Sequence, residues 1–375
     1  MTARGASAAI LRGRLVLEDH VEAGVVRIED GWIVAVEPDP GGAGGPYIAP
    51  GFVDVHVHGW GGHDAMGGPD ALTGMARALL RRGVTSFLPT AVTAPLDELA
   101  RFAERVRRWI PGAPDDGADP LGFNLEGPFL AETRRGAHAA AALRVPADVP
   151  LSDLEPLLDG LRVMTVAPEL DGALELIAWL DRHGIVASLG HSAADLVASR
   201  SGFDAGARST THLFNAMSGL HHREPGLALA ALTEDAAYAE LIADGQHVHA
   251  ALWPLIARTK PRDRLLLVSD AISLAGTNLT SARLGGLVVE IRDRRCVVAG
   301  SATLAGSLIA LDSAVANLVR AGIELPVTAA AASRNPLEML GVTDRGRIAV
   351  GQCADLVELD DEQRVVGVVR RGRRL

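Results

Sequence analysis

The chain has 375 residues, of which 48% are hydrophobic and 22% charged, and its formal net charge is -10 at pH 7. This charge argues against nucleic acid and anionic membrane surfaces as partners, because both require a basic footprint on the protein. The length allows one large domain and a second, small one.

The first fifty residues are predicted to form antiparallel β structure. Runs of β-forming residues cover 9–17 and 24–36, and Asp30-Gly31 in the second run is a two-residue hairpin signal. At the other end of the chain, 354–359 and 364–369 are similar runs separated by a polar turn. We expect the two ends to meet as one small β-sandwich domain, made of residues 1–49 and 342–375.

Between these ends, short apolar strands alternate with Ala- and Leu-rich helical segments, which is typical of a parallel sheet with crossover helices. Eight strands are predicted, and they start near Gly51, Val84, Leu121, Arg162, Ile185, Arg208, Tyr238 and Arg264. Repeated right-handed βα units in this length predict a (β/α)8 TIM barrel over residues 50–341.

Two segments inside the barrel region need separate interpretation. Residues 131–150 are rich in Ala and long for a βα loop, so we expect a lid or binding loop. Residues 300–319 are the most apolar stretch, but Asp312 and several Ser and Gly residues favour a loop followed by a buried helix over a membrane span. The apolar stretch near the start, residues 8–11, is too short for a signal peptide, and we expect a cytoplasmic protein.

His56 and His58 lie at the end of the first predicted barrel strand. Alternation along a strand points both side chains to the same side, so they can bind one metal ion together. A pair of partly buried structural histidines is the alternative. Cys296 and Cys353 lie far apart and form no CxxC pair, so any metal must have nitrogen and oxygen ligands.

Four more polar residues end other predicted strands, each at the same position relative to its strand. They are Glu126 on strand three, His191 on strand five, His212 on strand six and Asp270 on strand eight. Each alone could be a helix cap or a hydrogen-bonded core residue. Functional residues of a barrel come from the C-terminal ends of several strands, so the set together predicts a metal site at that rim.

This arrangement of strand-end ligands resembles the amidohydrolase superfamily. Further motifs resemble, more narrowly, the N-acetylglucosamine-6-phosphate deacetylase family, and they follow one another in family order between residues 50 and 310: Leu125-Glu-Gly-Pro-Phe129, Gly190-His-Ser192, Thr211-His-Leu-Phe-Asn-Ala-Met217, His221-His-Arg-Glu-Pro-Gly226, Ala243-Asp-Gly-Gln-His-Val248 and Leu304-Ala-Gly-Ser307. Many dinuclear amidohydrolases bridge their metals with a carboxylated lysine on strand four. The only lysine here, Lys260, precedes strand eight, and in the resembled family the strand-three carboxylate, here Glu126, takes that place.

The resemblance implies a metal-dependent deacetylase of amino-sugar phosphates. Glu126, His191 and His212 would hold the principal divalent ion, and His56 with His58 a second one bridged by Glu126. Zinc is the default, and iron(II) or manganese would also suit these ligands, with one or two ions per subunit. Asp270 would act as general base and then general acid beside the metal-activated water, and His138 in the lid loop would hydrogen-bond the substrate near the scissile carbonyl.

The resemblance also implies a sugar-phosphate pocket. Its substrate-binding residues would be Ala137, His138, Asn215, Ala216, Arg223, His247, Leu304, Ala305 and Gly306. The family offers the arginine across a dimer interface, where its fork of donors suits phosphate oxygens, so a homodimer is implied. A surface ion pair of Arg223 with Glu224 is the alternative.

Three other functions remain open at this stage. N-acetylgalactosamine 6-phosphate differs from N-acetylglucosamine 6-phosphate, the substrate that the resemblance implies, only in the orientation of one hydroxyl. Another amidohydrolase, such as an N-acyl-D-amino-acid deacylase or an adenine-type deaminase, is disfavoured by the phosphate-binding set Asn215, Arg223 and His247. A catalytically inactive sugar-phosphate sensor is disfavoured by Asp270, because a pure binder has no need of an acid/base carboxylate beside the metal.

Overall fold

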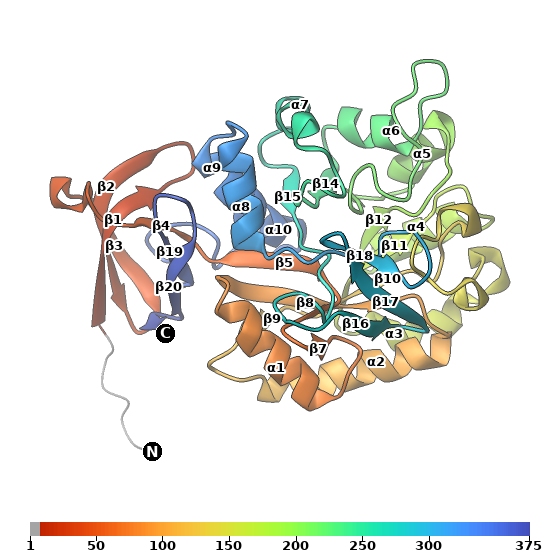
Figure 1. Cartoon of the computed structure of the whole chain (residues 1–375), viewed down its shortest axis with the longest axis horizontal. Helices are drawn as coiled ribbons and strands as arrows, with labels where there is room; N and C mark the ends of the chain where they lie inside the picture. The colour runs from red at the N-terminus through yellow and green to blue at the C-terminus, as the bar shows by residue number, and fades with distance from the viewer. Residues whose placement is uncertain (1–7) are drawn as a thin grey trace.

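The computed structural model describes residues 8–375. A barrel with its helices forms the larger part, and a small sheet stands at one side of it, where the C-terminus also lies (Figure 1). Within residues 8–375, no helix has the length and apolar character needed to cross a membrane.

Strands from both ends of the chain share one seven-stranded sheet, in the order β21-β20-β19-β4-β1-β2-β3. Their bounds are β1 Ala8–Val16, β2 Val21–Glu29, β3 Trp32–Pro38, β4 Tyr47–Pro50, β19 Leu356–Leu359, β20 Val365–Arg370 and β21 Arg373–Arg374. The turn between β2 and β3 has φ of 50° at Asp30 and 87° at Gly31, which fits the predicted two-residue hairpin. β4 pairs with β19, and this pairing joins the two chain ends. The domain boundaries at 49/50 and 341/342 stay predictions.

The barrel has the eight parallel strands that the sequence predicts, and each begins within two residues of its expected start. They are β5 Phe52–Val57, β8 Val84–Val92, β10 Phe123–Glu126, β11 Leu161–Val166, β12 Val186–Leu189, β13 Ser209–Thr210, β14 Tyr238–Leu241 and β15 Leu265–Leu267. The fold is a TIM-like (β/α)8 barrel. Its strands are covered on both faces, which explains why most read as apolar runs without alternation.

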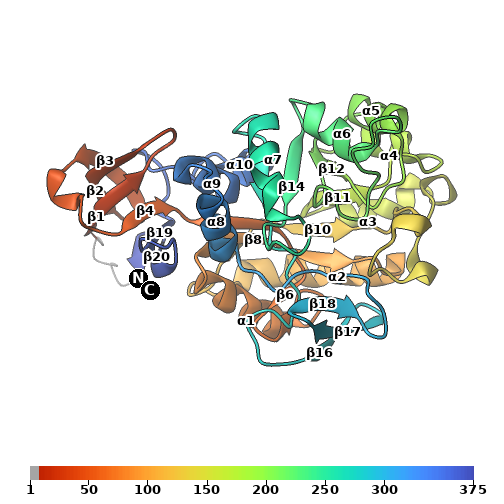
Figure 2. The ribbon, with the colours of Figure 1, turned by 45° about the horizontal axis from the view of Figure 1, so that its top comes forward.

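Ten α-helices are described. They are α1 Pro69–Leu80, α2 Leu96–Trp109, α3 Glu155–Leu158, α4 Ala173–Arg182, α5 Leu196–Asp204, α6 Leu227–Thr233, α7 Trp253–Thr259, α8 Leu311–Arg320, α9 Leu325–Ala332 and α10 Arg334–Met339. α2 illustrates why they form: Leu99, Phe102 and Val106 bury one face, and acidic residues in its first turn and arginines in its last complement the helix dipole. α8, the expected buried helix, stands with α9 and α10 between the small sheet and the barrel (Figures 1 and 2).

The barrel closes through backbone hydrogen bonds between its first strand and the segment after its last. Asp270 N–H donates to the carbonyl of His56 at 2.8 Å, and His58 N–H donates to the carbonyl of Ala271 at 2.8 Å. The seam of the barrel therefore runs through residues predicted to be functional.

A three-stranded antiparallel sheet follows the last barrel strand, and the sequence did not predict it. Its strands are β16 Ser281–Leu284, β17 Leu287–Arg292 and β18 Arg295–Val298. It lies beside the barrel near β6 Gly59–Trp60, which pairs with β7 His63–Asp64 (Figure 2). The remaining short strand, β9 Asp119–Pro120, pairs with β8. The expected lid loop, 131–150, contains the 3-10 turns Glu132–Arg134, Ala140–Ala142 and Pro146–Asp148.

Candidate metal and substrate site

The strand-end residues predicted to be functional adopt unusual backbone conformations. His191, His212 and Asp270 lie two or three residues beyond the ends of β12, β13 and β15, with φ of 47°, 28° and 48°. Positive φ is uncommon for residues other than glycine and is concentrated at functional sites. The chain therefore turns sharply where it leaves three strands of the barrel, at the same rim.

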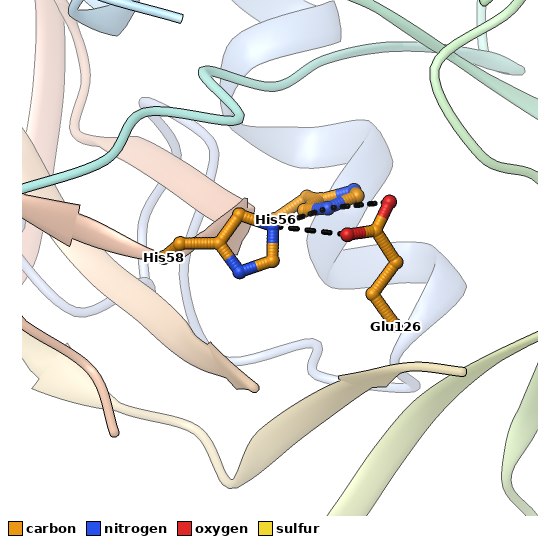
Figure 3. A group of neighbouring side chains, drawn as sticks. All are labelled: His56, His58 and Glu126. Carbon is orange, nitrogen blue, oxygen red and sulfur yellow. Dashed lines mark hydrogen bonds and ion pairs between the residues drawn. The ribbon is translucent and has the colours of Figure 1, made fainter. Parts of the chain in front are cut away.

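Glu126 stands at the centre of the site. Its Oε1 lies 3.0 Å from His191 Nε2 and 2.9 Å from His212 Nε2. Its Oε2 lies 3.1 Å from His58 Nε2, and His56 Nε2 is 3.5 Å from Oε1. In Figure 3 the carboxylate of Glu126 faces the rings of the strand-one pair. These residues form two groups that could each hold a metal ion, His56–His58–Glu126 and Glu126–His191–His212, and Glu126 belongs to both.

The outer nitrogens of two of these histidines are held by backbone carbonyls. His58 Nδ1 lies 3.1 Å from the carbonyl oxygen of Thr90, and His191 Nδ1 lies 2.8 Å from that of Arg134. A carbonyl oxygen only accepts, so Nδ1 carries the hydrogen in both rings. Their Nε2 atoms are then unprotonated in the neutral ring and point their lone pairs at Glu126.

His56 also carries its hydrogen on Nδ1, because this nitrogen donates to the Glu240 carboxylate at 3.0 Å. His56 Nε2 lies 3.3 Å from His58 Nε2, and His191 Nε2 lies 3.0 Å from His212 Nε2. In neutral rings the lone pairs of His56 Nε2 and His58 Nε2 face and repel each other, whereas a cation between them turns the repulsion into coordination. Histidine ligands whose second nitrogen is anchored in this way are typical of metal sites, so the residues present fit a divalent ion. His212 differs, because its Nδ1 has no hydrogen-bond partner among the described residues.

His138 has the opposite tautomer. Its Nδ1 accepts a hydrogen bond from the backbone N–H of Thr93 at 3.2 Å, so the hydrogen sits on Nε2, which lies 3.2 Å from Glu126 Oε2. Burial lowers the pKa of His138 to about 4, and the attraction of Glu126 offsets this only in part. The lid loop thus brings a neutral N–H donor to the site, held there partly by Arg135, which donates to the carbonyl of His138 at 3.2 Å.

Asp270 completes the inner surface. Its Oδ1 lies 3.2 Å from His58 Nε2 and 3.6 Å from His56 Nε2. Burial by itself would raise the pKa of Asp270. In the metal-free chain the neighbouring carboxylates raise the pKa values of His58 and His56, and the hydrogen bond and positive charge of these protonated rings outweigh burial and hold the pKa of Asp270 below its usual range. The carboxylate is therefore ionised and able to accept a proton.

A cavity of about 540 Å³ opens over these groups. Seven of the nine predicted substrate-binding residues line it: Ala137, His138, Asn215, Ala216, His247, Leu304 and Gly306. Ala305 does not, because it is fully buried and its N–H donates to the carbonyl of Cys296 at 3.0 Å.

His247 is a further titratable residue that lines this cavity. Its Nδ1 lies 2.8 Å from Asp244 Oδ2. Burial lowers the pKa of His247, but the hydrogen bond and charge of Asp244 outweigh this and raise it above its usual value. A histidine that gains positive charge readily suits an anionic group of a ligand.

Arg223 lies on an exposed loop and is not among the residues that line the cavity of this single chain. Its Nη1 lies 2.8 Å from His222 Nε2, and between residues 8 and 375 the expected alternative, an ion pair with Glu224, is not formed. His249, to which no role is assigned, accepts a hydrogen bond from the N–H of Ala251 and caps the 3-10 turn Ala250–Leu252.

Sequence reasoning missed three residues of the site. Glu240 is a charged residue inside the apolar strand β14, which was a usable signal, since a buried charge requires a partner. Arg134 and Arg135 line the cavity and precede Gly136 in the lid loop. Their only signal was their position in an otherwise Ala-rich segment.

Comparison with known proteins gives consistent matches over most of the chain. The model of the amidohydrolase family matches residues 47–375. The N-acetylgalactosamine-6-phosphate deacetylase of Escherichia coli O157:H7 is 39% identical over 367 residues, which cover 94% of this chain and 95% of that protein. The N-acetylglucosamine-6-phosphate deacetylase of Bos taurus is 39% identical over 337 residues, covering 86% of this chain and 81% of that protein.

A solved structure matches almost the entire fold. It is a mutant of N-acetyl-D-glucosamine-6-phosphate deacetylase from Mycobacterium smegmatis in complex with N-acetyl-D-glucosamine-6-phosphate. The TM-score is 0.90 at 33% sequence identity, with 98% of this chain and 99% of that chain covered.

Proposed function

The chain belongs to the amidohydrolase family, and from that premise we propose that it hydrolyses N-acetyl-D-glucosamine 6-phosphate to D-glucosamine 6-phosphate and acetate. The observation that carries the proposal is the contrast between tautomers around Glu126. Three histidines, His56, His58 and His191, hold their Nδ1–H on a carbonyl or carboxylate oxygen, which leaves Nε2 as the atom that can bind a metal, whereas His138 accepts at Nδ1 and presents an Nε2–H, as a donor to a carbonyl oxygen does. Relatives that carry this activity support it across most of the chain.

The metal of this proposal is divalent. Glu126, His191 and His212 hold the principal ion, and His56 with His58 and Glu126 hold a second one. Zinc is our default, and iron(II) or manganese fits the same nitrogen and oxygen donors. When bound, the ion lowers the pKa of water and polarises the amide carbonyl.

The chain's own residues move the protons. Asp270 accepts the proton of the attacking water, whose oxygen bonds to the acetyl carbon, while His138 donates a hydrogen bond to the carbonyl oxygen. Asp270 then delivers the proton to the sugar nitrogen as the C–N bond breaks, because an amine leaves poorly unless it is protonated. Acetate and the amine are the products, so atoms and charges balance.

The phosphate is the recognition group in this proposal. His247, Asn215 and the backbone N–H of Ala216 bind it from within the chain, and Leu304 and Gly306, which line the cavity, contact the sugar. Arg223 acts from a second copy of the chain in a homodimer, which agrees with its exposed position outside the cavity of its own chain.

Mixing two impaired variants, one weakened in phosphate binding and one in proton transfer, tests the shared site at concentrations of the phosphorylated substrate well below the KM of Arg223→Ala. Arg223→Ala chains keep Asp270, and Asp270→Asn chains keep Arg223, so a mixed dimer rebuilds one complete site from the two chains. We expect phosphate-dependent activity to return on mixing. Absence of any recovery in verified mixed dimers would show that Arg223 does not act across an interface.

The galacto epimer is the second candidate, because a relative named for N-acetylgalactosamine 6-phosphate matches 94% of the chain at 39% identity. Acetate release from both epimeric sugar phosphates, from unphosphorylated N-acetylglucosamine and from an N-acyl-D-amino acid separates the candidates. We expect the highest kcat/KM for N-acetylglucosamine 6-phosphate. A higher value for the galacto epimer would reassign the substrate, and release only from the amino acid would refute the sugar-phosphate function.

The cytoplasm is the compartment we propose. Cys296 and Cys353 are both buried free thiols, which suits a reducing environment.

A further inference from the structure

Glu240 on β14 is a fully buried carboxylate that contributes no atom to the cavity surface. Its Oε2 accepts hydrogen bonds from His56 Nδ1–H at 3.0 Å and from the backbone N–H of His212 at 3.1 Å. Its Oε1 is also buried and has no hydrogen-bond partner in the described part of the chain. Since Glu240 cannot touch a substrate in the cavity, any role it has must act through the two histidines.

These two histidines belong to different halves of the site. His56 is in the group with His58, and His212 is in the group with His191, while Glu126 is shared. Glu126 lines the cavity and belongs to both halves. Glu240 does not line the cavity, but its Oε2 binds one histidine of each half, His56 and His212.

The bond to His56 acts on the imidazole ring. A carboxylate at Nδ1 fixes the hydrogen there, leaves the Nε2 lone pair directed at Glu126 and makes that nitrogen a stronger electron donor. Without the acceptor, the ring could adopt the other tautomer, with a hydrogen on Nε2 that would block coordination.

The bond to His212 acts on the backbone. His212 has φ of 28°, and the N–H of the next residue, Leu213, donates to the backbone carbonyl of Glu240 at 2.8 Å. Side chain and main chain of Glu240 therefore hold two consecutive N–H groups of the turn that follows β13. A strained backbone conformation persists only when its surroundings fix it in this way.

A buried carboxylate with one unpaired oxygen is costly to keep in a folded chain, so its presence calls for an explanation. We propose that Glu240 is a positioning residue that makes the two halves of the site bind metal as one unit. It aims His56 Nε2 and keeps His212 in place at the same time. This inference rests on the proposed metal-dependent function.

Zinc titration of the metal-free full-length chain, in competition with a chromophoric chelator, tests the proposal. The variants are Glu240→Met, which removes the acceptor, and Glu240→Gln, which keeps an acceptor oxygen and removes the charge. Ser86→Ala is the matched control, because Ser86 is another fully buried polar residue of the barrel and its hydroxyl has no partner among the described residues. Thermal unfolding of each metal-free variant is the second measurement.

We expect the wild type and Ser86→Ala to bind two zinc ions per chain. Glu240→Met should lose the ion of the His56–His58 half and bind the other about 10- to 100-fold more weakly, with Glu240→Gln in between. The metal-free Glu240→Gln chain should be no less stable than the wild type, since glutamine keeps an acceptor oxygen for His56 Nδ1–H and the N–H of His212 while a buried charge is removed. A purely structural role would instead lower the stability of the metal-free variants.

Three results would overturn the proposal: two zinc ions bound by both Glu240 variants with wild-type affinity, an equal loss of affinity in Ser86→Ala, or a wild type that binds only one ion at saturating zinc. Failure of the proposed function looks different. In that case the wild type would release no acetate from any sugar phosphate, whatever the zinc titrations of the Glu240 variants give.

Discussion

Replacing Asp270 by Asn separates proton transfer from the other contributions to catalysis. The side chain is nearly isosteric, and its backbone position is fixed independently, because Asp270 N–H donates to the carbonyl of His56 at 2.8 Å and its own carbonyl accepts from Ser307 N–H at 2.7 Å. The variant should therefore keep the barrel seam and the cavity. What it loses is a group that can accept and return a proton beside His58 and His56.

The expected loss follows from what general acid–base assistance contributes, typically ~10² to 10⁴ in rate. At about 1.4 kcal/mol for each factor of ten, this corresponds to an increase of roughly 3 to 6 kcal/mol in the activation free energy. Because Asp270 acts on the reacting atoms and not on the phosphate, kcat should fall by this factor while KM changes little.

The assay is acetate release with N-acetylglucosamine 6-phosphate over a range of concentrations. Metal content is measured on the same samples, since Asp270 lies next to two proposed ligands. Asp312→Asn is the matched control: Asp312 is also buried, but it pairs with Arg82 at 2.8 Å and does not line the cavity. If Asp270→Asn retains kcat within tenfold of the wild type at full metal content, Asp270 is not the acid/base.

Removal of the metal by prolonged chelation should abolish activity but leave most of the helical circular dichroism intact, because the barrel core is large without the ion. Added divalent metal should then restore turnover, and global unfolding on chelation would contradict this prediction. His56→Asn combined with His58→Asn should reduce metal analysis from two ions per chain to one, and an unchanged count would refute the second site. Arg223→Ala should mainly raise KM for the phosphorylated substrate and hardly affect N-acetylglucosamine itself, so a large fall in kcat alone would point to another role. Burial lowers the pKa of Lys260 to about 8 in the folded chain, so between about pH 8 and 10.5 the unfolded chain binds more protons than the folded one. The free energy of unfolding of the wild type, measured in urea, should therefore rise relative to that of Lys260→Met as the pH goes from about 8 toward 10.5. A difference that stays constant over this range would refute the lowered pKa.

The barrel was predictable because its signals are local and repeated. Most strands are apolar runs bounded by polar residues. The two-residue strand β13 is polar, but it begins within one residue of Arg208, where the alternation of strands and helices predicts a strand. The metal-binding groups were predictable for the same reason. Residues at equivalent offsets from parallel strands meet at one rim whatever the details of packing.

What escaped prediction depends on contacts between distant segments. Nothing near Glu240 in the sequence reveals that it reaches both His56 and His212, and the tautomer of His138 is set by the N–H of Thr93, 45 residues away. The sheet β16–β18 carries its own turn signals, Gly285-Gly286 and Asp293-Arg294, but it follows the last barrel strand, where the βα repeat offers no further guide.

The barrel seam has a consequence for how the chain acquires activity. The residues it joins, His56 with Asp270 and His58 with Ala271, are more than two hundred positions apart, so closing it confines a long loop, and such non-local contacts tend to be slow steps in folding. Helices can form while the seam is still open, but the strand-one histidines and Asp270, the proposed acid/base, then stay separated. During synthesis on the ribosome the chain must remain inert until residue 271 has emerged and docked. In refolding experiments, the return of acetate release would therefore time the closure of the barrel, whereas circular dichroism would time the earlier growth of helices.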